Sequence, residues 1–268
     1  MPLRITLAGA TGWVGKALVA AIAASDDLEL AGAVSRSAAG QDAGEAAGLP
    51  RLGVAISATL EEALKTPSHV VIDYTKPNAV KAHVLTALAH GRHVVVGTSG
   101  LSAEEYAEID AVALKAERGV LAAGNFSITA TLLRRFALEA ARFVPDVEVI
   151  DYASAKKPDT PSGTARELAE LLSDVRQPAT SMSVDSLAGV RETRGGALGA
   201  KEAVQVHSLR MPSFVLSCEA VFGADNERLV IRHDAGSSAA PYVTGTLLAA
   251  RRVSSFIGLK RGLDAVMD

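Results

Sequence analysis

A glycine-rich turn near residue 10 narrows the possible folds more than any other stretch. The segment ITLAGATGWVGKALVAAI places Gly9, Gly12 and Gly15 after a short apolar run and at the start of a helical pattern. Glycines at such a junction permit a tight turn and a close approach of the backbone to a pyrophosphate, whose charge faces the helix N-terminus. The spacing is G-x-x-G-x-x-G, so the strand–turn–helix context carries the prediction. We expect a dinucleotide-binding unit; a purely structural turn is the alternative.

Short apolar runs alternate with helical patterns up to residue 126. This alternation is typical of βαβ units around a parallel sheet. Strands are expected at Ile5–Ala8, Leu28–Val34, Val70–Asp73, His93–Val96 and Val120–Ala123, and helices at Val14–Ala24, Leu60–Lys65, Val80–Ala89 and Glu104–Glu117.

After Phe126 the pattern changes to a helix followed mainly by strands. Helices are expected at Ile128–Phe143, Arg166–Leu172 and Pro241–Phe256, and strands at Val147–Ala153, Met182–Ser186, Val204–Leu209, Phe214–Phe222 and Arg228–His233. A run of strands indicates a mixed or antiparallel sheet on its own domain. The predicted class is α/β, with a Rossmann-type parallel-sheet domain (residues 1–126 and 236–268) and a smaller α+β domain with a mixed sheet (residues 127–235).

Composition argues against several other classes of protein. The net charge of −3 and the pI of about 6.1 disfavour a nucleic-acid partner. Cys218 is the single cysteine, which favours a reducing compartment. The first residues run directly into an apolar strand, and no uncharged apolar run reaches about 18 residues. We therefore expect a soluble cytoplasmic protein without a signal peptide or membrane partner. No cluster has metal-ligand spacing, so no metal is expected.

The ends of the predicted strands carry polar turns. The second strand ends at Ser35 and Arg36, where an NAD site normally has an acid for the ribose 2′-OH. A hydroxyl beside a guanidinium suits a 2′-phosphate, which favours NADPH and leaves NADH possible; an ordinary exposed Arg36 is the alternative. Three further turns, DYTKP (73–77), GTSG (97–100) and AGNFS (123–127), also fall at carboxyl ends of strands, where open α/β sheets bind ligands.

The stretch KKPDTPSGTA places two lysines before a helix start. Pro161 suits the first turn of a helix, and the N–H groups that follow it have no intrahelical partner. A carboxylate beside Lys157 and these N–H groups would be well bound. The alternative is that Ser162 only caps its own helix and that the lysines are solvated.

Together these motifs resemble the 4-hydroxy-tetrahydrodipicolinate (dihydrodipicolinate) reductase family of lysine biosynthesis. The resemblance covers nearly the whole chain and includes IDYTKP, GTSG, GNFS, KKPDTPSGTA, VHSLR and VFGADNERLVIRHDA. It implies that two hinges join the Rossmann domain to a substrate-binding and oligomerisation domain, whose open sheet builds a homotetramer. It also implies hydride transfer from NADPH or NADH to a cyclic imine dicarboxylate held at a cleft that closes around it.

The resemblance assigns roles residue by residue. Lys157 would donate a proton and bind substrate, with Ser162, Gly163 and Thr164 as the carboxylate-binding turn. Cofactor binding would fall to Gly9, Ala10, Thr11, Gly12, Trp13, Val14 and Gly15 at the pyrophosphate, Ser35 and Arg36 at the ribose, and Gly97, Thr98, Ser99, Ala123, Asn125 and Phe126 at the nicotinamide.

Several positions depart from the family pattern. Ala153 and Ser154 stand where the family usually has two histidines, Ser238 where it has an arginine, and Ser217 where it often has a histidine. Loss of a positioned acid typically costs 10²–10⁴-fold in rate. His207 or His233 would replace the missing acid only if its side chain faces the cleft. Two alternatives stay open: a paralogue that reduces a less charged imine or ketimine, and a catalytically silent NADP(H)-binding protein.

Overall fold

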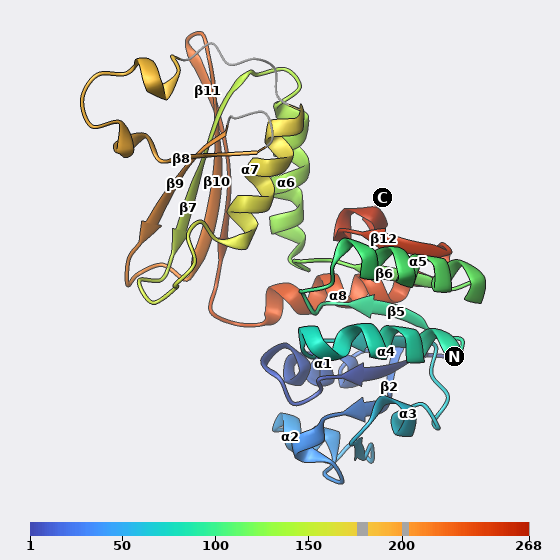
Figure 1. The fold of residues 1–268 in the computed structure, drawn as a ribbon. Coiled ribbons are helices and arrows are strands. Elements are labelled where there is room, and N and C mark those ends of the chain that lie inside the picture. The colour runs from blue at the N-terminus through green and yellow to red at the C-terminus, as the bar shows by residue number, and fades with distance from the viewer. Residues whose placement is uncertain (176–181, 200–203, 268) are drawn as a thin grey trace. The chain divides into compact units, whose positions relative to one another are not determined.

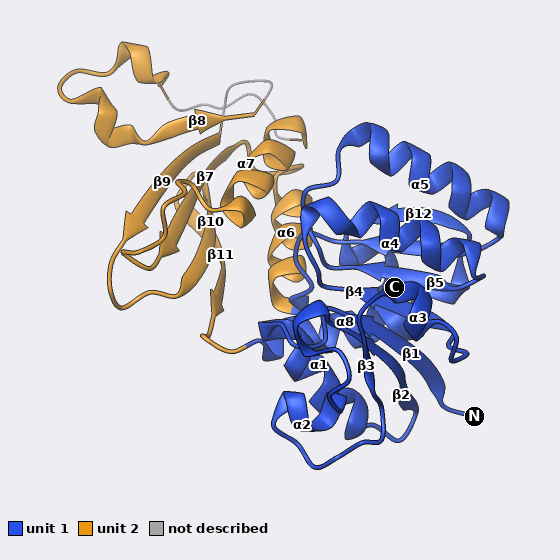
Figure 2. Cartoon of the chain, turned by 60° about the horizontal axis from the view of Figure 1, so that its bottom comes forward, with its two compact units in different colours: residues 1–128, 239–268 blue, residues 129–238 orange. Residues whose placement is uncertain are grey.

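The computed structural model describes residues 1–175, 182–199 and 204–267 of the 268-residue chain (Figure 1). The chain divides into two compact units, which Figure 2 shows in different colours. Unit 1 comprises Met1–Ile128 and Ala239–Asp268, and unit 2 comprises Thr129–Ser238. The chain thus leaves unit 1 once and returns to it once.

Unit 1 contains a parallel sheet whose strand order is β12-β6-β5-β4-β1-β2-β3. Its strands are β1 (Leu3–Ala8), β2 (Leu28–Val34), β3 (Ile56–Ser57), β4 (Val70–Asp73), β5 (His93–Val96), β6 (Gly119–Ala122) and β12 (Gly258–Arg261). The order runs outward from β1 to β3 and then restarts at β4 on the other side of β1. The strand order therefore reverses between β1 and β4, which is where open α/β sheets bind dinucleotides.

Helices cover both faces of this sheet (Figure 1). They are α1 (Trp13–Ala23), α2 (Ala43–Ala47), α3 (Leu60–Ala63), α4 (Pro77–Ala89), α5 (Ala103–Ala116) and α8 (Ala240–Arg252), with 3₁₀ segments at Arg36–Ala38, Val253–Ser255 and Leu263–Val266. Alternate residues of one strand serve the two faces: in β4, Val70 and Ile72 join the core under α1 and α8, and Val71 joins the core under α3, α4 and α5. Burial on both faces explains the continuous apolar runs of the sequence.

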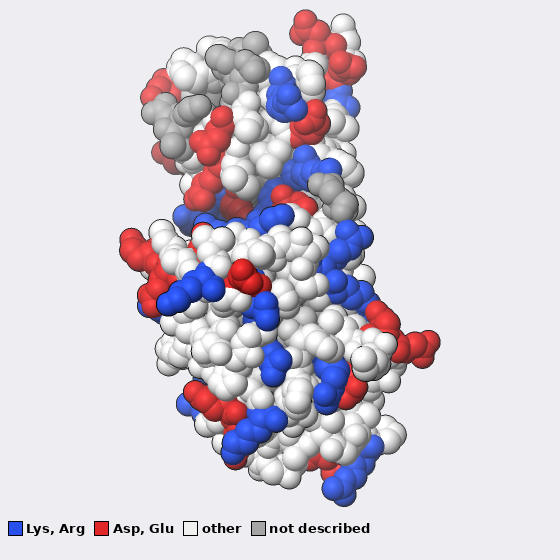
Figure 3. Space-filling view, turned by 90° about the vertical axis from the view of Figure 1, so that its right-hand side faces the viewer, with Lys and Arg blue, Asp and Glu red and all other residues white. Residues whose placement is uncertain are grey.

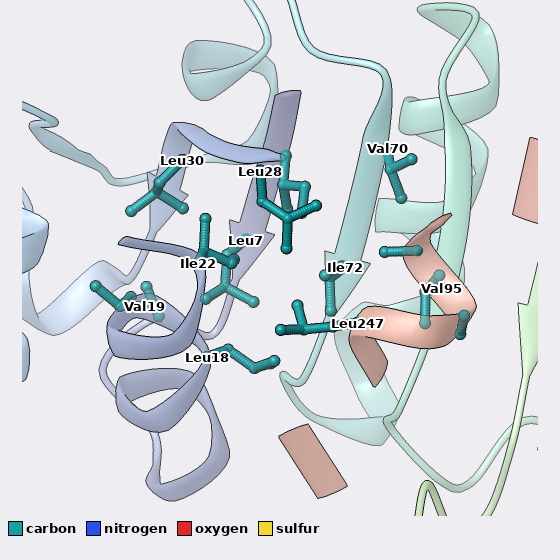
Figure 4. Packing of buried hydrophobic residues seen from close by; sticks show 14 of the residues in the cluster. Leu7, Leu18, Val19, Ile22, Leu28, Leu30, Val70, Ile72, Val95 and Leu247 are labelled. Atoms are coloured by element: carbon teal, nitrogen blue, oxygen red, sulfur yellow. The ribbon is translucent and has the colours of Figure 1, made fainter. Parts of the chain in front are cut away.

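The core under α1 and α8 joins the two ends of the chain. Leu18 and Ile22 of α1 and Leu247 of α8 pack around Leu7 of β1 (Figure 4). All four side chains are at most 6% exposed. The C-terminal helix is thereby an integral part of the parallel-sheet unit.

Unit 2 contains a mixed sheet with the strand order β11-β10-β7-β9-β8. Within the described residues, β7 and β9 pair in parallel and the other neighbouring strands are antiparallel. Its strands are β7 (Asp146–Ala153), β8 (Gly196–Leu198), β9 (Val204–Arg210), β10 (Leu216–Ala224) and β11 (Glu227–Ala235). Helices α6 (Ile128–Ala140) and α7 (Gly163–Val175) pack on one face, and short 3₁₀ segments lie at Val184–Ser186 and Arg191–Arg194. Along β7, buried residues alternate with partly exposed ones, as expected for a sheet covered on one face.

The predicted fold class is confirmed, with local errors. The segment Met182–Ser186 is not a strand, because Ser186 N and Oγ both bond to the Ser183 carbonyl and close a 3₁₀ turn. Helix α8 ends at Arg252, and a 3₁₀ turn follows where continuous helix was expected to Phe256. Four short elements, α2, β3, β8 and β12, were not predicted.

Two further observations concern the described residues as a whole. Among them, no helix is long and apolar enough to cross a membrane, and no three His, Cys, Asp or Glu side chains gather as a metal site would require. On the face shown in Figure 3, basic and acidic side chains are interspersed, in line with the small net charge of −3.

Candidate functional site

The glycine turn after β1 has the backbone shape that a pyrophosphate needs. Gly9 lies at φ +87°, a conformation that favours glycine, and its N–H donates to the Val34 carbonyl at 3.0 Å. A Cβ built on Gly15 would overlap the Gly9 carbonyl oxygen. Gly12 begins α1 without a side-chain cap, so the first N–H groups of an 11-residue helix stay available to an anion.

The other predicted residues of this turn play different parts. Ala10 is 2% exposed, so its side chain belongs to the core and only its backbone reaches the turn. Val14 packs against the same core. The Trp13 side chain is 60% exposed and meets the Tyr242 ring edge-on at a centroid distance of 5.8 Å.

Hydroxyl groups gather at the end of β2. Ser35 begins the 3₁₀ segment that contains Arg36, and its Oγ lies 2.7 Å from Thr11 Oγ1 and 3.4 Å from Ser37 Oγ. Arg36 itself is exposed. The structure thus brings Thr11 of the glycine turn next to Ser35 and adds Ser37, which the sequence analysis had not singled out.

The loops after β5 and β6 lie at the same edge of the sheet. Gly97 packs under the Tyr74 ring so closely that a Cβ there would overlap it. Thr98 is buried and Ser99 is exposed. Asn125 Oδ1 accepts the Ser127 N–H at 2.8 Å, which shapes the turn after Ala123. The Phe126 side chain is 1% exposed and packs 6.1 Å from the Tyr74 ring, so it supports the loop from below.

In unit 2 the lysine-containing loop connects β7 to α7. Lys157 N donates to the Ser154 carbonyl at 2.9 Å, and Lys157 Nζ pairs with Asp159 Oδ1 at 2.9 Å. Hydrogen bonding to Lys157 holds the pKa of Asp159 below its ordinary value. Ser162 is buried and its Oγ accepts the Ala165 N–H at 3.4 Å, which is the capping role weighed from the sequence. Gly163 is exposed and Thr164 is half-buried at the helix start.

A buried ion pair, missed by the sequence analysis, fixes this loop. Asp151 is fully buried, and its Oδ2 accepts from Ser162 N at 2.9 Å, Ser208 Oγ at 3.1 Å and Arg210 Nη2 at 2.8 Å. Arg210 Nη2 also donates to the Asp159 carbonyl at 2.8 Å. The pair therefore ties β7 and β9 to both ends of the stretch that follows Lys157.

The two histidines of unit 2 lie on opposite faces of its sheet. His207 pairs in register with Ile150 and its Nε2 lies 2.7 Å from Glu148 Oε2, on the face away from Asp151. His233 pairs in register with Cys218 on the helix-covered face, is 7% exposed and lies 3.0 Å from Thr129 Oγ1. Burial lowers the pKa of His233. Each histidine thus has a hydrogen-bond partner within unit 2, Glu148 for His207 and Thr129 for His233.

The positions that depart from the family pattern have local roles. Ala153 is fully buried at the end of β7, with Ser154 directly after it. Ser217 Oγ donates to Asp234 Oδ1 at 2.6 Å, on the face opposite to that of the buried Cys218. Burial raises the pKa of the Cys218 thiol to about 12, which makes it a poor nucleophile.

Comparison with known proteins gives the same family over both units. The sequence profile described as "Dihydrodipicolinate reductase, N-terminus" matches residues 3–126, and that described as "Dihydrodipicolinate reductase, C-terminus" matches residues 129–263. The chain belongs to the dihydrodipicolinate reductase family. The resemblance inferred from the motifs is therefore confirmed.

Full-length relatives of this family include two curated bacterial proteins. The 4-hydroxy-tetrahydrodipicolinate reductase of Synechococcus elongatus is 39% identical over 275 residues, with 99% of each chain covered. That of Desulfitobacterium hafniense is 35% identical over 268 residues, again with 99% of each chain covered. A solved structure, dipicolinate-bound dihydrodipicolinate reductase from Paenisporosarcina sp. TG-14, is 26% identical with a TM-score of 0.88 over the whole of both chains. An amine dehydrogenase from Mycobacterium smegmatis, 16% identical with a TM-score of 0.67 over 97% of this chain and 95% of its own, shares the fold.

Proposed function

We propose that this dihydrodipicolinate reductase family member is a 4-hydroxy-tetrahydrodipicolinate reductase, an NAD(P)H-dependent oxidoreductase of the lysine and diaminopimelate pathway. Relatives with that name are 35–39% identical over almost its whole length. The structural observation that carries the proposal is the turn at Ser162, whose N–H is anchored on Asp151 close in sequence to Lys157. A protein that only binds a nucleotide has no need of such a turn.

The glycine turn of unit 1 fits a dinucleotide. Side chains larger than hydrogen at Gly9 and Gly15 would collide with backbone atoms, so these glycines allow the tight turn that a pyrophosphate-binding loop requires. Bound NAD(P)H supplies a hydride. The N–H groups at the start of α1 would hold the pyrophosphate of that cofactor.

We further propose that NADPH is preferred over NADH. Arg36 and the hydroxyl groups of Thr11, Ser35 and Ser37 suit the charge and the hydrogen-bonding needs of a 2′-phosphate. Removal of the Arg36 guanidinium should weaken NADPH far more than NADH. Dissociation constants of both cofactors for Arg36→Ala test this, and an equal loss for the two would refute the 2′-phosphate assignment.

In unit 2, Lys157 and the helix start would bind a substrate carboxylate. The N–H groups of Gly163 and Thr164 fall in the first turn of α7, where the helix dipole adds partial positive charge. The Lys157 ammonium, oriented by Asp159, adds a full charge and holds protons for transfer to the substrate nitrogen. A carboxylate that binds there competes with Asp159 for the ammonium.

Consumption of NADPH with freshly generated 4-hydroxy-tetrahydrodipicolinate tests the activity. Lys157→Ala should lose at least 100-fold in kcat/KM, the scale of a lost positioned acid. Lys156→Ala, a neighbouring lysine that is exposed, is the matched control and should stay within a few-fold of wild type. Turnover of other cyclic imines alone would favour the paralogue, and cofactor binding without any turnover would favour the silent protein.

A homo-oligomer, with a homotetramer as the specific form, is also proposed. The sheet face of unit 2 that α6 and α7 leave uncovered carries Leu209 and Val230, which are 36% and 48% exposed. Light scattering on the purified protein tests the assembly, and a monomer at micromolar concentration would refute it. A cytoplasmic location stays a prediction.

A further inference from the structure

We propose that Asp73 and His83 are positioning residues for the nicotinamide half of the cofactor. They would keep the loops after β4 and β5 in a fixed arrangement against which the nicotinamide binds. The inference rests on the proposed function only in taking NADPH as the ligand. It is carried by a hydrogen-bond network inside unit 1.

The centre of the network is a buried carboxylate at the end of β4. Asp73 is fully buried, and its Oδ1 accepts from Thr75 N at 3.1 Å, Thr75 Oγ1 at 2.8 Å and Thr98 Oγ1 at 2.6 Å. Thr98 Oγ1 in turn accepts the Thr75 N–H at 2.7 Å. One carboxylate oxygen thereby fixes the first residues of two separate loops.

The second carboxylate oxygen is held by a histidine from α4. His83 Nδ1 lies 2.7 Å from Asp73 Oδ2, and its side chain is 23% exposed. Because a carboxylate only accepts hydrogen bonds, Nδ1 must carry the proton and donate. A fully buried carboxylate without such a donor would pay a large desolvation cost, so His83 fixes the orientation that Asp73 presents to the loops.

The same loops contact the glycine turn. A Cβ on Gly9 would overlap the Tyr74 carbonyl oxygen, and a Cβ on Gly97 would overlap the Tyr74 ring. Tyr74 is anchored from behind, because its OH lies 2.7 Å from Thr246 Oγ1 of α8. The loops after β1 and β5 are therefore both packed on Tyr74, which follows Asp73 directly in the loop after β4.

The position of the network in the sheet identifies the half of the cofactor that it serves. Strand order reverses between β1 and β4, and a dinucleotide lies across that point with its pyrophosphate on the β1 turn. Arg36 and the hydroxyl cluster at the end of β2 lie on one side and suit the adenosine ribose. Thr75 and Thr98, which Asp73 holds, lie on the other side, after β4 and β5, so the loops that contain them would carry the nicotinamide ring.

This placement predicts a selective effect on binding. Loss of the His83 donor should loosen the nicotinamide side and leave the adenosine side intact. A general structural defect would weaken both sides alike. The ratio of two dissociation constants, for NADPH and for 2′-phospho-ADP-ribose, which lacks the nicotinamide, separates these cases.

The test uses titration calorimetry on the full-length protein. His83→Leu should weaken NADPH at least tenfold and change the affinity for 2′-phospho-ADP-ribose less than twofold. His83→Asn, whose amide nitrogen can take the place of Nδ1, should restore NADPH binding to within about threefold of wild type. His90→Leu, an exposed histidine at the end of the same helix, is the matched control and should bind both ligands as wild type does. If His83→Leu does not fold, Thr75→Val removes another Asp73 donor and should show the same selectivity.

Three results would overturn the inference: equal weakening of both ligands, no weakening of either, or an Asn variant as weak as the Leu variant. Wild-type protein that binds NADPH no more tightly than the fragment would also overturn it, because the nicotinamide half would then contribute nothing. Wild-type protein that binds NADPH but reduces no cyclic imine would refute the proposed function and leave this inference standing.

Discussion

Replacement of Asp151 by asparagine is the sharpest test of how the lysine-containing loop is held. The substitution keeps the size of the side chain and removes its charge. Asp151 Oδ2 accepts from Ser162 N, Ser208 Oγ and Arg210 Nη2, and Oδ1 is buried with no hydrogen-bond partner among the described residues. If Asn keeps its oxygen at the Oδ2 position, its NH₂ group becomes a buried donor without an acceptor. If it flips, the NH₂ group meets three donors.

The cost follows from the burial of the pair. Removal of one partner of a buried ion pair costs about 3–5 kcal/mol. The Arg210 side chain is 18% exposed and retains its bond to the Asp159 carbonyl, so the lower end applies. We expect Asp151→Asn to lower the free energy of unfolding by about 3 kcal/mol, which is more than a 100-fold change in equilibrium constant. Asp151→Asn combined with Arg210→Met should cost less than the single change, because no charge is then left unpaired.

Urea denaturation gives the total cost, and hydrogen exchange of the segment 154–162 shows whether the loss is local. Faster exchange of this segment than of the rest of unit 2 is expected, because an amide oxygen is a weaker acceptor for the Ser162 N–H than the carboxylate. Glu170→Gln, an exposed position on α7, is the control and should change the free energy of unfolding by less than about 0.5 kcal/mol. A cost below 1 kcal/mol, or strictly additive effects of the two changes, would refute the reasoning.

Two further predictions concern unit 1. Gly15→Ala should abolish measurable cofactor binding, because its methyl group would collide with the Gly9 carbonyl, whereas Gly223→Ala, which has open space around it, should not; calorimetry distinguishes them. The pKa of His93 is lowered mainly by burial, and its Nδ1 accepts the Gly119 N–H at 2.9 Å. The unfolded chain therefore binds the proton first as pH falls, so this stability is complete above about pH 6.5 and is lost below it. His93→Asn keeps an acceptor oxygen for the Gly119 N–H but cannot take up the proton. Urea titrations at pH 7.5 and 5.5 should therefore show a smaller loss of unfolding free energy at the lower pH, by at most about 1.4 kcal/mol per pH unit. An unchanged pH dependence would contradict the assignment.

The long elements were predictable because local pattern and burial agree. In β4 the run Val70–Ile72 is apolar since it is buried on both faces, and in β7 alternation reflects a sheet covered on one face. Elements such as β3, with two residues, are set by pairing with a neighbouring strand and leave no periodic signal. At Met182–Ser186 a strand was predicted wrongly because apolar and polar residues alternate there. The segment does not pair with a strand of the described sheet, and its serine side chains form local hydrogen bonds instead.

The candidate site was predictable where a motif is contiguous. The glycine turn and the Ser162 turn each lie within one short stretch, so their spacing carries the chemistry. The ion pair that holds the Ser162 turn could not be predicted in this way, because Arg210 is 59 residues from Asp151 and only the fold brings them together. A usable signal existed: an acid at an inward position of an alternating strand must find a donor. The Asp73–His83 pair, ten residues apart, needs the geometry of α4 to bring it together.

In each unit a buried carboxylate at or near the end of a strand holds the backbone of the loop that follows. A loop that binds a ligand, as we propose for these two, must present some N–H groups to the ligand and still hold its own backbone in place. At the end of β4 a buried carboxylate takes the Thr75 N–H, and near the end of β7 another takes the Ser162 N–H. Each carboxylate then needs its own donor, His83 or Arg210. Apolar replacement of a whole pair should therefore cost less stability than loss of the charged partner alone, but it leaves the loop N–H without its acceptor.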